Sequence, residues 1–85
     1  MNTFQLNISS PDGKIFEGAV ARITVRGAEG DLAVMAGHVP FITTVKPGEV
    51  RVVLPDGTTR VGHARSGLLT VAREGVTLLG DFSWD

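Results

Sequence analysis

The sequence has 85 residues, of which 42% are hydrophobic, and its eight basic and nine acidic side chains leave a formal net charge of −1. This length permits one small hydrophobic core, and the balanced charge without a basic cluster argues against nucleic-acid binding, where phosphate neutralisation dominates affinity. The absence of cysteine excludes disulfides and thiolate zinc sites, and no apolar run approaches the ~18 residues of a membrane span.

The first third of the sequence alternates apolar and polar side chains, which is typical of strands with one buried face. Residues 4–9 show this alternation, and residues 10–13 place proline and glycine as a type I turn does. We therefore expect an antiparallel pair with residues 14–19. Residues 20–26 alternate again and predict a third strand.

Residues 27–41 combine three glycines, two acidic residues, a histidine and a proline around a short apolar run. Gly27 and Gly30 flank a predicted tight turn, because positive φ costs glycine nothing. Glu29, Asp31 and His38 would not be tolerated together in a core strand. The sequence therefore predicts turn, strand and turn, displayed as a surface.

The second half is also divided into short segments by turn signals. Asp56-Gly57 lies between alternating segments and predicts a hairpin, whereas Ser66-Gly67 is expected to interrupt a strand. The predicted strands here cover residues 41–45, 50–54, 58–64, 67–72 and 76–81, with a possible continuation through Trp84. With eight to ten short strands and no helical window, the pattern favours an all-β sandwich or barrel in a single domain, residues 1–85.

The sequence gives little support for a catalytic site or a metal-binding site. Ser66 near His63 lacks the surrounding glycines of a nucleophile elbow. A metal site from His38, His63 and the two loop acids would need ligands from separate loops without a supporting spacing. No phosphate-binding loop is present. We therefore predict no catalytic residue, no metal site and no cofactor.

Several apolar residues allow both a structural and a partner-binding interpretation. Val39, Pro40, Phe41 and Ile42 follow His38 directly, and strand alternation cannot bury all four on one face, so part of this patch suits a protein interface. Met35 more commonly fills a core.

Trp84 is close to the end of the sequence. It is predicted either to cover the sandwich as a lid or to anchor a partner, because tryptophan is enriched at interface hot spots.

Three segments, residues 10–18, 27–41 and 42–48, closely resemble the epsilon subunit of F-type ATP synthases, whose pattern includes F-E-G, then G-x-E-G-[DE]-L followed by G-H-x-P, and a K-P-G turn. The resemblance covers essentially all 85 residues, but only the family's amino-terminal domain. It implies a β-sandwich of about ten strands. The helical hairpin that usually follows has no residues here, so neither its brake on ATP hydrolysis nor its ATP site is expected.

The resemblance further implies a non-catalytic part of the central rotor, which binds the gamma subunit, contacts the ring of c subunits and works with the head subunits. It would couple ion-driven rotation to ATP synthesis on the cytoplasmic face of a bacterial inner membrane, attached peripherally and without nucleic acid. The matching acidic position, Asp31, faces the c ring in the family, and His38 lies where the sandwich meets gamma and the c ring. The expected partner-binding residues are Glu29, Asp31, His38, Val39, Pro40 and Phe41.

The sequence departs from the family pattern at three places. Ala33 and Ser66 stand where glycines are common, and Ala36 where a proline is usual, so we expect a different loop backbone if any of these needs positive φ. Two other functions remain as alternatives. A free-standing sandwich module for a ligand or peptide would need a concave aromatic site, and a small hydrolase would need a clustered nucleophile or acid.

Overall fold

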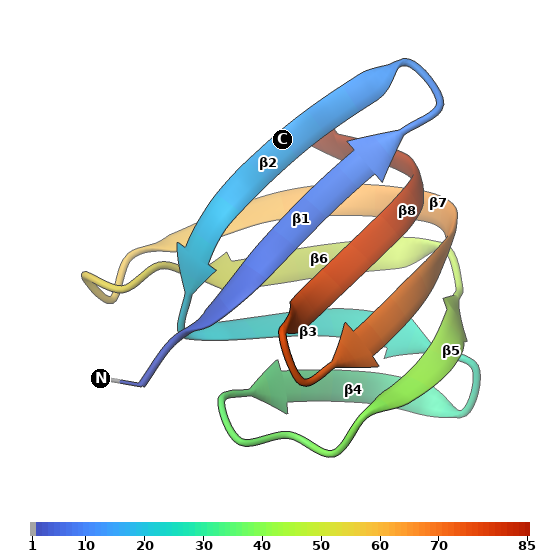
Figure 1. Ribbon diagram of the computed structural model, residues 1–85. Coiled ribbons are helices and arrows are strands. Elements are labelled where there is room, and N and C mark those ends of the chain that lie inside the picture. The colour runs from blue at the N-terminus through green and yellow to red at the C-terminus, as the bar shows by residue number, and fades with distance from the viewer. Residues whose placement is uncertain (1) are drawn as a thin grey trace.

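The computed structural model describes residues 2–85, and the strands that it contains are shown in Figure 1. They are β1 (Phe4–Ser10), β2 (Gly13–Val20), β3 (Arg22–Gly27), β4 (Gly30–Met35), β5 (Phe41–Val45), β6 (Gly48–Val53), β7 (Thr59–Ala72) and β8 (Gly75–Trp84). No helix in the described residues is long and apolar enough to cross a membrane. The predicted all-β class is confirmed.

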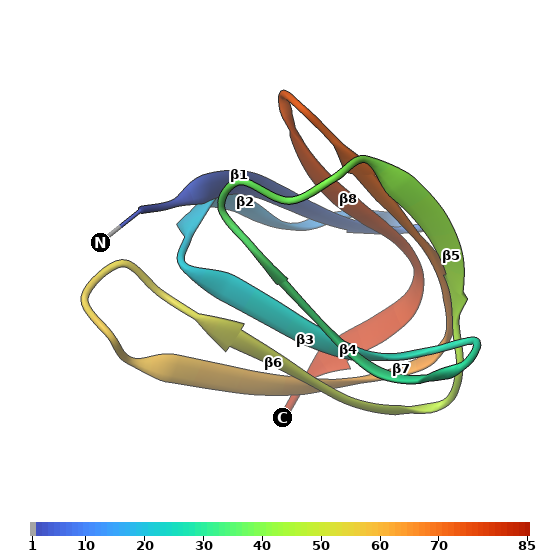
Figure 2. The same cartoon turned by 90° about the horizontal axis from the view of Figure 1, so that it is seen from below.

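The strands form two layers that share β7 and β8 (Figures 1 and 2). The first half of β7 pairs with β6, and its second half pairs with β5. Along the other layer β8 runs parallel to β1, and β8 also pairs antiparallel with β7 along its whole length, from Ala72↔Gly75 to Gly62↔Trp84. The two layers are therefore held together by continuous chain as well as by the core.

The expected number of about ten strands is corrected to eight described strands. Ser66-Gly67 does not interrupt β7, because the register shift between Ala64 and Ser66 is absorbed as a bulge within one long strand. Such a bulge bends a strand without ending it. Opposite the bulge, a Cβ on Gly80 would meet the Ser66 carbonyl oxygen and would lie 2.5 Å from the Gly67 Cα, so this crossing requires glycine.

The core between the layers is entirely apolar in the part of the chain that the structure describes. It consists of Leu6, Ile8, Val20, Ile23, Val25, Val34, Val45, Val50, Val52, Ala64, Leu69, Val71, Val76, Leu78 and Phe82. These residues occupy alternate positions of their strands, as the period of two requires. The opposite positions consequently face outward and are free to differ in chemistry between the two layers.

The turns follow their sequence signals. Gly13 and Gly57 have positive φ and end the two predicted hairpin turns, which join antiparallel strands. In residues 2–85 positive φ occurs at glycines alone. Ala33 and Ala36 therefore cause no backbone strain, and Ala33 is an ordinary exposed position of β4.

Candidate partner-binding surface

The turn between β3 and β4 displays two acidic side chains. Gly27 pairs with Gly30, whose φ of 129° permits the tight reversal. Glu29 and Asp31 are both exposed. The ion pairs found among residues 2–85 join other side chains, so neither carboxylate has a charged partner within the described chain. The turn thus presents two carboxylates without ion-pair partners, although Arg26 is the cross-strand neighbour of Asp31.

His38 lies half-buried behind the loop that joins β4 to β5. Its Nδ1 lies 2.8 Å from the Met35 carbonyl oxygen, and its Nε2 lies 2.9 Å from that of Ala72, at the end of β7. The ring also contacts Phe4 edge-on, with centroids 5.6 Å apart. His38 therefore anchors the loop to two neighbouring segments, and both ring nitrogens already face acceptors within the chain.

The three residues after His38 divide between surface and core. Val39 is 78% exposed, and Pro40 is exposed as well. Phe41 packs against the core, whereas the next residue, Ile42, is 66% exposed. The loop therefore displays an apolar tip whose position is fixed on one side by His38 and on the other by Phe41.

A hollow of about 550 Å³ lies between the β3–β4 turn and β5. Residues 27–32 form one wall, and residues 41–43 form the other. It brings Glu29 and Asp31 beside Phe41, while His38 and the Val39–Pro40 tip lie outside its lining. The six predicted residues consequently form two adjoining parts, the acidic turn with its hollow and the loop tip.

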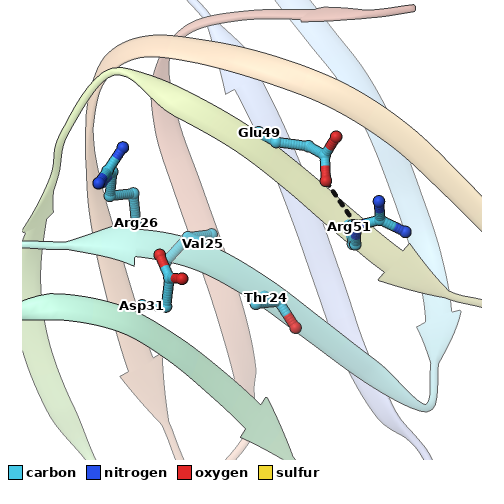
Figure 3. A pocket seen from close by; sticks show the side chains of 6 residues that line it. All are labelled: Thr24, Val25, Arg26, Asp31, Glu49 and Arg51. Carbon is cyan, nitrogen blue, oxygen red and sulfur yellow. Dashed lines mark hydrogen bonds and ion pairs between the residues drawn. The ribbon is translucent and has the colours of Figure 1, made fainter.

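The outer side of β3, β4 and β6 is charged (Figure 3). Arg26 is the cross-strand neighbour of Asp31, and Glu49 forms an ion pair with Arg51 on the same strand. Thr24 lies among these four charged side chains in a hollow that they line. Because charges of both signs alternate here, this side is a solvated surface rather than a site for one kind of ion.

The outer side of β1, β8, β7 and β5 has no charged residue in its central part. Two rows of cross-strand neighbours, defined here as the uncharged face, run across these strands. They are Ser9, Leu79, Leu68 and Thr44 in one row and Asn7, Thr77, Thr70 and Ile42 in the other. Ile42, Leu68 and Leu79 are 66%, 41% and 52% exposed.

Leu68 and Leu79 were not predicted from the sequence as site residues. Within Leu68-Leu69 and Leu78-Leu79 one leucine is buried and the other exposed, and composition does not distinguish them. The alternation of inward and outward positions along each strand could have identified them. Counted from a buried residue, it places one leucine of each adjacent pair on the outer side.

The other candidate residues have structural surroundings. His63 Nδ1 lies 2.6 Å from Asp85 Oδ1 at the surface. Ser66 lies at the β7 bulge. No group of three potential metal ligands occurs in residues 2–85. Met35 is 55% exposed, so its expected place in the core is wrong.

Trp84 continues β8 as expected and packs, partly buried, against the core. It makes edge contacts with Phe16 and Phe82, with centroids 5.9 and 5.0 Å apart, and the Arg60 guanidinium lies 3.9 Å from the centroid of its ring. Its surroundings agree with the predicted lid.

Known proteins share both this fold and its sequence features. The sequence matches the family model of the β-sandwich domain of the ATP synthase delta/epsilon chain over residues 3–82. A chain of the Euglena gracilis mitochondrial ATP synthase, in a structure of OSCP, F1 and c ring, is 25% identical with a TM-score of 0.90. The match covers 96% of this chain and 53% of the Euglena chain.

A chain of the Tetrahymena thermophila mitochondrial ATP synthase, from its central stalk and c ring, is 16% identical with a TM-score of 0.78. The match covers 66% of the Tetrahymena chain and 96% of this chain. The chain described here thus spans about half of one similar chain and about two thirds of the other. Because the family model covers nearly every residue, this chain belongs to the ATP synthase delta/epsilon family as its β-sandwich domain.

Proposed function

We propose that the chain is a non-catalytic central-stalk subunit of an F-type ATP synthase, which binds the gamma subunit and contacts the c ring. In this position it helps to couple ion translocation to ATP synthesis by the head subunits. It would be held peripherally at the membrane by the complex, on the cytoplasmic face in a bacterium. The observation that carries the proposal is the uncharged face.

The uncharged face has the properties of a protein interface. Charged residues make up 20% of the sequence, yet none occurs in its two rows, and Leu68 and Leu79 are direct cross-strand neighbours. Contiguous exposed apolar side chains are characteristic of interaction sites, and charged residues are depleted in interface cores. We assign this face to the gamma subunit.

Asn7 in the same face supports this assignment. Its side-chain Oδ1 is buried and has no hydrogen-bond partner in the described chain. An unsatisfied polar atom is costly, and a donor from a docked subunit would remove that cost. The exposed Lys14 and Glu17 on the neighbouring strand β2 supply a charged rim.

The acidic turn and the loop tip are assigned to the c ring. Glu29 and Asp31 lack ion-pair partners in the described chain, and Val39 and Pro40 are exposed in the loop that follows the other end of β4. A close-packed sandwich suits a coupling part, since protein interiors are dense and transmit strain. Rotation could thus be passed from ring to stalk without large deformation.

The test is binding to purified gamma subunit from the same organism, measured by size exclusion with mass detection. The wild-type chain should form a one-to-one complex. Leu68→Lys places a charge in the uncharged face and should weaken the complex at least tenfold. Thr59→Lys is the matched control, because it adds the same side chain to an exposed position of the same strand.

Folding of both variants is checked by far-UV circular dichroism before the binding measurement. A folded wild-type chain that stays alone would contradict the proposal. Equal loss of binding in Leu68→Lys and Thr59→Lys would move the gamma contact away from the uncharged face.

A further inference from the structure

Strand β4 is an edge of the sheet whose outer side is unpaired. In the described residues it pairs with β3 along its whole length and with no other strand. An edge strand presents a row of free N–H and C=O groups, which can pair with another extended chain. At the far end of β4, the carbonyl oxygen of Met35 lies within hydrogen-bond distance of His38 Nδ1.

The other edge, β2, carries protection that β4 lacks. Its pairing with β1 contains a bulge beside Ile8 and Ser9, and Lys14 and Glu17 form an exposed ion pair 2.8 Å long. Bulges and charged side chains are common means of blocking edge-to-edge association. The exposed side chains of β4 include a single charge, Asp31, with Ala33 and Met35 following it.

The beginning of β4 borders the hollow of about 550 Å³ described above. Leu32 and Phe41, both partly buried against the core, line it, and Ile42 adds exposed apolar surface. Figure 2 shows β4 and β5 running apart on this side, joined by the loop of residues 36–40. An aliphatic side chain would fit between these walls.

The negative charge at the hollow restricts which partner segments would bind there. Glu29 and Asp31 line the hollow, and no lysine or arginine does so. Neither acid has an ion-pair partner within residues 2–85. A neighbouring lysine or arginine from outside would be attracted here, because charge complementarity favours association and fixes register.

We propose that β4 accepts an extended segment of a partner polypeptide by strand addition, with an aliphatic side chain in the Leu32–Phe41 hollow and a basic side chain beside Glu29 and Asp31. Main-chain hydrogen bonds provide affinity in this mode, and pockets for alternate side chains provide specificity. The occupant is a foreign strand with an alternating aliphatic and basic pattern.

This inference deepens the proposed function, because it states how the acidic turn would hold a neighbouring subunit. The strand-addition inference and the proposed function can be disproved separately. Binding of gamma to the uncharged face does not require β4, and a peptide can pair with β4 in a chain that does not bind gamma.

The test uses end-blocked hexapeptides in which valine alternates with arginine or threonine. They are titrated into the isotope-labelled 85-residue chain and followed by NMR chemical shifts and amide hydrogen exchange. We expect saturable shifts and slower exchange confined to β4 and to the hollow wall at residues 41–43. The same peptides with every backbone nitrogen methylated should not bind, because they lack the donors for the ladder.

A pair of variants tests the charge. Glu29→Gln should weaken binding of the arginine peptides about two- to fivefold, as expected for one exposed ion pair, and should leave the threonine peptides unaffected. Glu74→Gln is the control, because it removes an exposed carboxylate from the β7–β8 turn and should change neither.

Absence of saturable shifts in β4, pairing at β2 instead, or equal binding of the N-methylated peptides would overturn the inference. Shifts of β4 that grow with protein concentration in the absence of peptide would also overturn it, because a second copy of the chain would then be the occupant.

Discussion

His38 shows how a single side chain determines the position of an exposed loop. The distances to the Met35 and Ala72 carbonyl oxygens place both ring nitrogens in hydrogen-bond range of the backbone. A neutral imidazole has one N–H and donates to one carbonyl, whereas the doubly protonated ring donates to both. The link from the β4–β5 loop to the end of β7 is made by the Nε2–H group, which the doubly protonated ring and one of the two neutral tautomers carry.

Replacement of His38 by alanine should therefore lower the free energy of unfolding by about 1–3 kcal/mol, since a half-buried polar contact is lost. His63→Ala is the matched control, because this exposed histidine pairs with Asp85 at the surface and should give a smaller change. Chemical denaturation followed by the fluorescence of Trp84 measures both. Equal effects would mean that the loop does not depend on the His38 ring.

The role of His38 also marks a limit of sequence-based prediction. Its sequence neighbours, Gly37 and Val39, indicate an exposed loop, which is correct for the backbone. The carbonyl of Ala72 that holds the ring is contributed by a distant strand, and nothing in the local pattern indicates it. The partner-binding role of His38 stays a prediction, and a fair test must separate assembly from stability.

At the scale of elements, the β6–β7 hairpin is held by its turn carboxylate. The Thr58 hydroxyl donates to Asp56 Oδ1 over 2.7 Å, and the Thr58 backbone N–H donates to the same oxygen over 2.9 Å. These two hydrogen bonds, the hydroxyl first, lower the pKa of Asp56 below its ordinary value of 3.8.

Because the folded pKa lies below the unfolded one, the contribution of Asp56 to stability is complete above pH 3.8 and is lost as the pH falls through the lower folded value. Thr58→Val removes the hydroxyl donor and keeps the N–H donor. We expect the pKa of Asp56 to rise part of the way toward 3.8, as measured by carboxyl carbon shifts in an NMR titration.

Such turns explain why the positions of several strands along the chain were predictable. Proline and glycine at residues 10–13 and Asp56-Gly57 impose local geometry that few other conformations satisfy. Ser66-Gly67 gave the opposite result, because the same residue types suit a bulge as well as a break. Only the partner strand β8, which continues past the bulge to Asp81 and Phe82, decides between the two.

For the whole molecule, the decisive contacts join the two ends of the chain. Strand β1 pairs in parallel with β8, and Ile8, Leu69 and Leu78 are neighbours across three strands, each almost fully buried. Such non-local pairing makes the sandwich one cooperative unit and predicts folding in milliseconds to seconds. The outer side of the same strands carries the uncharged face, so adjacent residues of β8 would serve stability and the proposed gamma binding separately.

Leu78 and Leu79 allow this separation to be tested. Leu78→Ala removes a side chain that is 1% exposed and should cost about 2–5 kcal/mol of unfolding free energy, a large part of a typical total. Leu79→Ala truncates a side chain that is 52% exposed and should leave the denaturation midpoint nearly unchanged while weakening gamma binding. Chemical denaturation gives the stability of each variant, and titration with gamma gives its binding affinity. If Leu79→Ala instead lowered stability as much as Leu78→Ala and left gamma binding intact, the outer leucines would belong to the packing of the sandwich, and the gamma contact would have to lie elsewhere.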